Sequence, residues 1–188
     1  MRILLLTIAL AAASCATAAE TPTVVRQGPP VWHRQVEEQV ARLGHRNVVI
    51  VADSAYPIQT ARGVKVIVTG ADHRDVVAHV AGAIDRAPAV RPLIALDKEF
   101  RYVPEEHAPG AARLRQGILD LLQGKSAEPI RETLHGDLLK EVSATAETYE
   151  VVVFKTTGTI PYSSVFFTLD CGYWSAEAEQ ALRDAMAE

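Results

Sequence analysis

Residues 43–57 decide the fold, and their sequence is Leu43-Gly44-His45-Arg46-Asn47-Val48-Val49-Ile50-Val51-Ala52-Asp53-Ser54-Ala55-Tyr56-Pro57. Gly44 can adopt the left-handed conformation that ends a helix, and the unbroken apolar run over 48–52 predicts a strand covered on both faces. Asp53 then stands at the carboxyl end of that strand. In open α/β sheets ligands bind at this edge, so Asp53 is a candidate site residue. An ordinary alternative stays open, in which Asp53 caps a turn and His45 satisfies the end of a helix.

Further helices and strands are predicted before and after this segment. Apolar residues at helical spacing predict helices over 32–43, 73–86, 114–122, 130–146 and 176–187, and short apolar runs predict strands over 64–69, 93–96, 151–154 and 165–169. About five short strands thus alternate with about five helices. This order predicts an α/β fold, with helices covering a mostly parallel sheet, in a single domain over residues 31–188.

The composition excludes several classes of partner. A formal net charge of −4 over 188 residues, without any cluster of Lys or Arg, argues against binding to nucleic acid or to an anionic membrane surface. Gly70 and Gly158 stand in turns, but neither belongs to a full nucleotide-binding motif. His73 and His79 are six residues apart and fall on opposite sides of a helix, so they cannot bind one metal ion together. No metal and no other cofactor is predicted.

The amino-terminal residues have the pattern of a secretory signal. Arg2 is followed by an apolar run over 3–13 and by small residues up to Ala19, and the apolar run is too short to span a bilayer. Residues 1–19 are therefore expected to be a signal peptide and residues 20–30 an extended arm, in an exported, periplasmic protein. A lipoprotein acylated at Cys15 is the alternative, which Ala12 disfavours because a bulky aliphatic residue is usual at that position.

Two separated motifs resemble the ribose pyranase and fucose mutarotase (RbsD/FucU) family. Leu43-Gly44-His45, the apolar strand and Asp53-Ser54-Ala55-Tyr56-Pro57 are similar to the family's Gly-His, strand and Asp-Ala-x-x-Pro opening. Residues 155–165, Lys-Thr-Thr-Gly-Thr-Ile-Pro-Tyr-Ser-Ser-Val, resemble its closing segment, in which Thr-Gly leads to Pro-Tyr-x-Asn and a final strand. Ser164 departs from this pattern, because the family usually has Asn there.

The resemblance implies an activity, an assembly and a three-layer fold. It implies a cofactor-free isomerase that interconverts anomers or ring forms of a monosaccharide, and ring-shaped homo-oligomers with sites near the subunit contacts. A second hypothesis is a non-catalytic sugar-binding or assembly protein on the same scaffold. Ser164 favours the second hypothesis, since it lacks the amide donor and acceptor that could hold adjacent sugar hydroxyls.

Three residues are predicted to form the catalytic site, namely His45, Asp53 and Tyr162. Ser164, Lys140 and His135 are predicted at its margin as sugar-binding residues. An imidazole with a pKa near ~6.5 can both accept and donate a proton, which makes His45 the acid/base candidate. The eight residues from His45 to Asp53 would span ~26 Å if fully extended at ~3.3 Å per residue. Either the chain curls over 44–47, or neighbouring subunits bring two copies together.

Export leads to a direct prediction about the mature protein. Residues 1–19 should be absent from protein recovered from its native host, because signal peptidase removes such segments. Amino-terminal sequencing or intact mass measurement checks this. A chain that still begins at Met1 would contradict export, whereas a diacylated Cys15 would support export of a membrane-anchored form.

Overall fold

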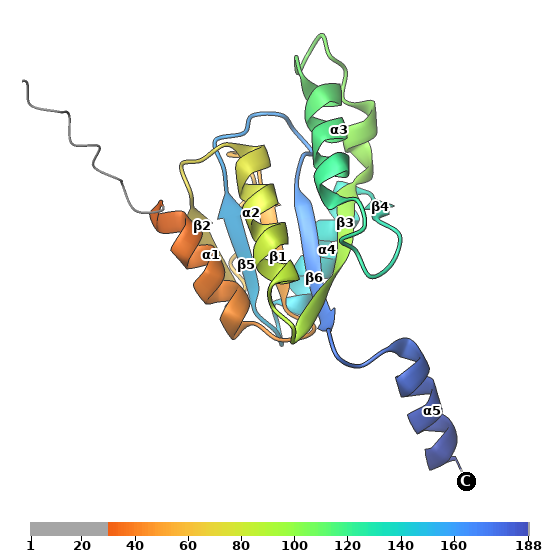
Figure 1. Ribbon diagram of the computed structural model, residues 1–188. Coiled ribbons are helices and arrows are strands. Elements are labelled where there is room, and N and C mark those ends of the chain that lie inside the picture. Colours follow the sequence, from red (N-terminus) through yellow and green to blue (C-terminus); the bar gives the residue numbers. More distant parts are fainter. Residues whose placement is uncertain (1–29, 188) are drawn as a thin grey trace, which may run out of the picture.

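A computed structural model describes residues 30–187 of the chain (Figure 1), so the predicted signal peptide, the arm up to residue 29 and Glu188 lie outside the described residues. The helices are α1 (Val31–Arg42), α2 (His73–Asp85), the 3-10 helix η1 (Lys98–Tyr102), α3 (Ala111–Leu122), α4 (His135–Thr145) and α5 (Ala176–Met186). The strands are β1 (Val48–Ala52), β2 (Val64–Val68), β3 (Val90–Asp97), β4 (Arg131–Thr133), β5 (Val151–Lys155) and β6 (Val165–Cys171).

The strands form one six-stranded sheet in the order β2-β5-β1-β6-β3-β4. Strand β5 pairs in parallel with β1 and β2, and β3 pairs in parallel with β4, whereas β6 is antiparallel to both β1 and β3. Five strands therefore run in one direction and β6 runs in the other. The predicted α/β fold with a mostly parallel sheet is confirmed, with six strands where about five were expected. The carboxyl ends of five strands and the amino end of β6 meet at one edge of the sheet.

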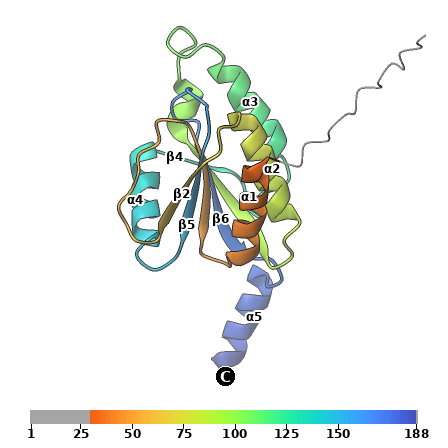
Figure 2. The ribbon, with the colours of Figure 1, turned by 90° about the vertical axis from the view of Figure 1, so that its left-hand side faces the viewer.

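Strand β1 lies at the centre of a three-layer arrangement. All five of its residues are buried. Val49 and Val51 pack in the same apolar cluster as α1, α2 and α3, while Val48, Ile50 and Ala52 pack with α4 on the other face. Figure 2 shows these layers from the side, with α4 opposite α1, α2 and α3 across the sheet. The strand is thus covered on both faces, as its unbroken apolar sequence predicted.

One strand was missed by the sequence pattern, and one predicted helix began too early. Residues 131–133 form β4, paired with 95–97 of β3, and α4 begins only at His135. A three-residue strand has too few positions for a recognisable period, and its conformation is set by pairing with β3. Strand β3 also begins at Val90 and contains Pro92, which is tolerated because β4 pairs only with the end of β3.

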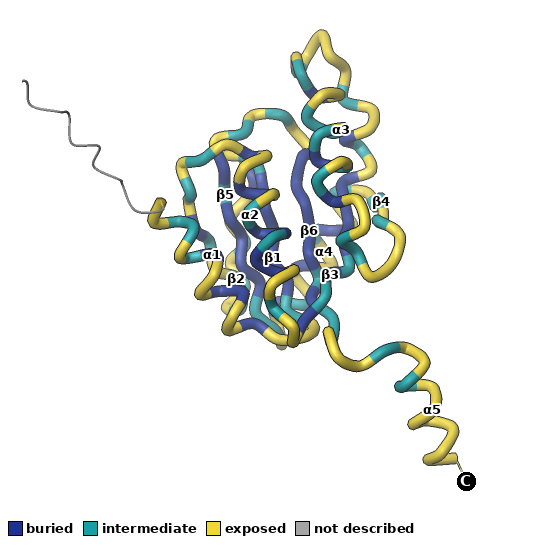
Figure 3. The backbone as a smooth tube through the Cα atoms, in the orientation of Figure 1, coloured by how far each residue is buried: buried dark blue, intermediate teal, exposed yellow. Residues whose placement is uncertain are grey.

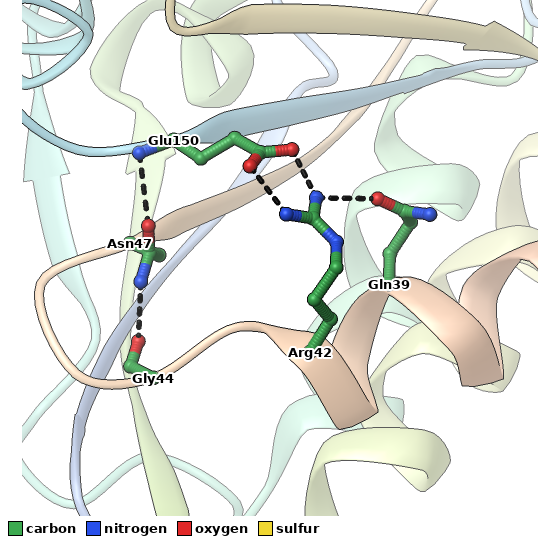
Figure 4. A network of polar contacts seen from close by, with 5 residues as sticks. All are labelled: Gln39, Arg42, Gly44, Asn47 and Glu150. Atoms are coloured by element: carbon green, nitrogen blue, oxygen red, sulfur yellow. Dashed lines mark hydrogen bonds and ion pairs between the residues drawn. The ribbon is translucent and has the colours of Figure 1, made fainter.

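The turn from α1 to β1 is held by side chains, and the predicted role of Gly44 in it was wrong. The left-handed residue in this turn is Arg46, with φ of 71°, and not Gly44. The Asn47 side chain donates to the Gly44 carbonyl (3.0 Å) and accepts from the backbone N–H of Glu150 (2.9 Å). The Arg42 guanidinium forms an ion pair with both carboxylate oxygens of Glu150 (Figure 4). These contacts fix the turn to the start of β5.

Helix α5 leaves the body of the domain after β6. None of its side chains is buried, and Figure 3 shows it mostly exposed. Ser175 caps it by accepting from the backbone N–H of Ala178 (3.1 Å), as its sequence position predicted. Within residues 30–187, no helix is long and apolar enough to cross a membrane.

Packing around Gly63 gives a stability prediction. A Cβ at residue 63 would lie 2.6 Å from the carbonyl oxygen of Tyr149 and would also meet that of Ala146. Gly63→Ala is therefore expected to lower the free energy of unfolding by about 2 kcal/mol, because backbone atoms cannot move aside easily. Urea denaturation measures this change. Gly44→Ala is the matched control, since a Cβ there meets nothing within 4 Å, and it should change stability by less than about 0.5 kcal/mol.

Candidate functional site

The edge where the strands end collects the polar side chains of the candidate site. Asp53 follows β1, Asp97 is the last residue of β3, and His135 begins α4 just after β4. Tyr162 and Ser164 precede β6, and they reach the same edge because β6 runs against the other strands. Ligands in open α/β sheets bind at such an edge. Five residues from four segments distant in sequence are thus brought to one edge by the topology.

The His135 ring lies between two phenol rings. Its centroid is 5.5 Å from the ring of Tyr162 and 6.5 Å from that of Tyr56, both in edge-to-face geometry. The Tyr162 residue is 40% exposed and the His135 side chain 25% exposed, whereas Tyr56 is buried. An imidazole and a phenol are therefore both reachable from solvent at this edge. Either group can exchange a proton with a bound hydroxyl.

Two carboxylates hold His135 from β3 and η1. Asp97 Oδ1 lies 2.9 Å from His135 Nδ1, and the Glu99 carboxylate accepts from the backbone N–H of His135 at 3.0 and 3.1 Å. The Asp97 side chain is fully buried. This burial raises the pKa of Asp97 to about 6, although the hydrogen bond with His135 opposes the rise. Asp97 was not predicted as a site residue, and its position at the end of an apolar strand was the available signal.

Three buried polar atoms at this edge have no hydrogen-bond partner within residues 30–187: Tyr56 Oη, Asp97 Oδ2 and Ser164 Oγ. Burial raises the pKa of Tyr56 well above its ordinary value, and the charges of Asp97 and Asp53 add to the rise. Such unpartnered buried groups are uncommon. Ser164 is thus placed inside this polar cluster, with its side chain fully buried.

Tyr162 has an unusual backbone conformation. Its φ of 57° lies in the left-handed region, which is strained for a bulky residue and costs roughly 1–3 kcal/mol. Strain of this kind persists only where neighbours hold the chain in place. Ser163, which follows Tyr162, is held by the buried side chain of His73. Nε2 of His73 lies 2.9 Å from the Ser163 carbonyl oxygen, and Nδ1 lies 3.0 Å from Thr156 Oγ1. Since the carbonyl can only accept, Nε2 of His73 carries the proton.

Asp53 takes part in a local turn at the same edge. Its Oδ1 accepts from the backbone N–H of Ala55 (2.8 Å), which matches the turn-capping alternative. Its charge nevertheless acts on Tyr56 and His73, so it lies close to both. The turn-capping contact occupies only one carboxylate oxygen.

Two predicted site residues lie away from this cluster in the single chain. His45 precedes β1 and is exposed at the opposite edge of the sheet, near Asp170 at the end of β6. Lys140 is 81% exposed and pairs with Asp137 on the same helix (2.9 Å). The chain does not curl to bring His45 to Asp53, so the subunit alternative is the one left for their convergence. Within residues 30–187, no three His, Cys, Asp or Glu side chains cluster tightly enough to bind a metal ion.

Comparison with known families identifies the domain. Residues 26–172 match the model of the RbsD/FucU transport protein family. The chain belongs to this family. The RbsD/FucU match ends at residue 172, so α5 lies beyond it. No curated protein sequence matches the chain.

Two solved structures are similar to the chain. RbsD of Bacillus subtilis complexed with D-ribose is 14% identical, with a TM-score of 0.53, over 79% of this chain and 99% of that chain. Fucose mutarotase from Streptococcus pneumoniae in complex with L-fucose is 12% identical, with a TM-score of 0.49, over 70% of this chain and 87% of that chain. At these identities the likeness to RbsD shows the fold.

The buried imidazole beside Tyr162 gives a prediction for stability and its pH dependence. At about pH 7.5, His73→Ala should lower the free energy of unfolding by about 3 kcal/mol, because the Ser163 carbonyl and the Thr156 hydroxyl lose a buried partner. Burial lowers the pKa of His73, so the ring is neutral in the folded state. Below about pH 6.5 the unfolded chain binds a proton that the folded chain does not, and the wild-type protein loses stability.

The free energy of unfolding of the wild-type protein should therefore exceed that of His73→Ala by less at about pH 5 than at about pH 7.5. Urea denaturation at both pH values measures it. A difference that widens at the lower pH would contradict a neutral, buried His73.

Proposed function

We propose that the protein is an exported, cofactor-free sugar mutarotase or pyranase. The observation that carries the proposal is the His135–Tyr162 pair, with ring centroids 5.5 Å apart and both rings reachable from solvent, beside Asp53 in a chain of the RbsD/FucU family. Family membership and the ribose- and fucose-bound neighbours support a monosaccharide as the substrate. Nothing in the composition favours nucleic acid as a partner.

The pair supplies the two proton transfers that the reaction needs. His135 takes the proton of the anomeric hydroxyl, the bond between C1 and the ring oxygen breaks, and Tyr162 gives its phenolic proton to that oxygen. An open-chain aldehyde results. On reclosure from the other face, the ring oxygen returns its proton to Tyr162 and His135 protonates the new anomeric oxygen. Because sugars mutarotate unaided, one acid/base pair worth ~10²–10⁴-fold suffices.

The proposal includes assembly into a ring-shaped homo-oligomer. His45 and Asp53 stand at opposite edges of one sheet, so a site that uses both must combine two copies of the chain. His45 of one copy would then add a second acid/base group beside Asp53 of its neighbour. Asp53 would bind a sugar hydroxyl through the carboxylate oxygen that its turn leaves free.

A second candidate function is sugar binding without catalysis. Ser164 favours it, because its hydroxyl is fully buried and has less reach than the Asn usual in the family. Rapid binding with no acceleration of anomer exchange is the outcome that this candidate predicts.

Anomer exchange of D-ribose and L-fucose, followed by saturation-transfer NMR, separates the two functions. Each of His135→Ala, Tyr162→Phe, His45→Ala and Asp53→Asn should slow exchange at least about tenfold, because each removes a proton donor or acceptor. Ser164→Asn should keep or raise the rate. His107→Ala is the matched control, since His107 is exposed on a loop and its one side-chain contact within residues 30–187 is with Glu106.

Circular dichroism and sedimentation show whether each variant keeps its fold and assembly. If no variant changes exchange while sugars still bind, the catalytic proposal is wrong and the binding function replaces it. A monomer at micromolar concentration would contradict the shared His45–Asp53 site but would leave the His135–Tyr162 pair intact.

A further inference from the structure

Asp97 is an unusual group to bury at the end of a strand. Its side chain has no exposed surface, and Oδ2 has no hydrogen-bond partner within residues 30–187. Removing a carboxyl group from water is unfavourable unless its oxygens are paired. Its Oδ1 accepts from Nδ1 of His135 at 2.9 Å, and the backbone N–H of Ser164 also acts to lower the pKa of this carboxyl group. A carboxylate that served stability alone would be better paired or replaced by an apolar residue.

The contacts of His135 are divided between its backbone and its ring. Glu99 accepts from the backbone N–H at 3.0 and 3.1 Å and so fixes the first residue of α4. Asp97 then fixes the ring through Nδ1. Nε2 forms no hydrogen bond within the described residues, the ring packs edge to face with that of Tyr162, and the side chain is partly exposed. The ring therefore has one nitrogen anchored inside and one available.

We propose that Asp97 is the positioning residue of the site, which keeps the proton of neutral His135 on Nδ1 and presents Nε2 as an unprotonated base to the sugar. A carboxylate can only accept, so its contact with Nδ1 requires a proton there. A neutral imidazole has one N–H, so Nε2 then keeps its lone pair. That Nε2 takes a proton from a sugar rests on the proposed function, whereas the position of the proton on Nδ1 of His135 does not.

The same contact serves the second half of the reaction. When Nε2 takes the anomeric proton, His135 becomes a cation, and the fully buried Asp97 carboxylate at 2.9 Å offsets the new charge. The proton stays on Nε2 until the ring closes. The charged and titratable groups around Asp97 and His135 are Glu99 from η1, Asp53 and Tyr56 from the segment after β1, and Tyr162 from the segment before β6.

The state of the ring can be measured without any sugar. Full-length mature protein with ¹⁵N-labelled histidine gives long-range ¹H–¹⁵N spectra that distinguish the two neutral forms, and loss of one signal set in His135→Gln assigns the residue. At about pH 7.5 the wild-type ring is expected as the Nδ1–H form, the opposite of the form that a free imidazole side chain favours in water. A wild-type ring in the Nε2–H form would overturn the proposal, and this test needs no variant that could fail to fold.

The matched variants are Asp97→Leu and Glu99→Gln. Asp97→Leu removes the acceptor while filling the same space, so the ring should revert toward the Nε2–H form and exchange at saturating sugar should fall at least about tenfold. The half-saturating sugar concentration should change less than about threefold, because Asp97 does not touch the sugar. Glu99→Gln keeps an acceptor for the backbone N–H and should leave the Nδ1–H form in place.

The two measurements separate the possible failures. An unchanged ring form in folded Asp97→Leu would overturn the positioning role, whatever the rates. An Nδ1–H ring that reverts in Asp97→Leu, in a protein whose wild type accelerates no sugar, would overturn the proposed function and leave the assignment of the ring standing.

Discussion

The antiparallel insertion of β6 between β1 and β3 is the constraint on which the candidate site depends. If β6 were parallel to its neighbours, Tyr162 and Ser164, which immediately precede it, would lie at the edge of the sheet where His45 lies. Running the other way, β6 delivers Tyr162 and Ser164 to the edge where β1 and β3 end. Its pairing with both strands extends over most of its length, so this placement is fixed by many backbone hydrogen bonds. No local feature of the segment around Tyr162 could supply it.

Buried polar contacts then turn this placement into a defined geometry. His73, from the start of α2, reaches under the segment before β6 and holds the Ser163 carbonyl. Its neighbour Tyr162 keeps a left-handed backbone that an unrestrained chain would leave. On the other side of the site, Asp97 and Glu99 hold His135 by ring and backbone. The two partly exposed rings of His135 and Tyr162 therefore meet edge to face because separate elements support each of them. Both supports use polar groups buried in the domain, where loss of one partner is costly.

Local patterns of apolar residues predicted most of the helices and strands. The apolar run over 48–52 is long enough to indicate a strand covered on both faces, and the helices show the spacing of one buried side. Strand β4 could not be predicted, since three residues carry no period. Of the site, Asp53 and Tyr162 were predicted from position and motif, whereas His135 was predicted only at the margin as a sugar-binding residue. Asp97 was missed although it ends an apolar strand as Asp53 does, because that position alone does not tell whether the carboxylate faces solvent or, as here, lies buried against a histidine ring. Only the long-range pairing of β3 with β4 places His135 beside it.

The position of His45 bears on how the site and the assembly are related. Strand β1 advances about 3.3 Å per residue, so its five residues hold His45 and Asp53 roughly 17 Å or more apart. The side-chain contacts around Asn47 and Arg42 tie the turn that carries His45 to the start of β5, which prevents it from folding over toward the other edge. Internal motion of one chain therefore cannot close this distance without breaking the central strand.

A site that used both His45 and Asp53 would exist only between copies of the chain, and its population would rise with protein concentration, as for any property that depends on association. The His135–Tyr162 pair has no such requirement, because both rings belong to one edge of one chain. Dependence of activity on concentration thus distinguishes a shared site from one that each chain contains alone.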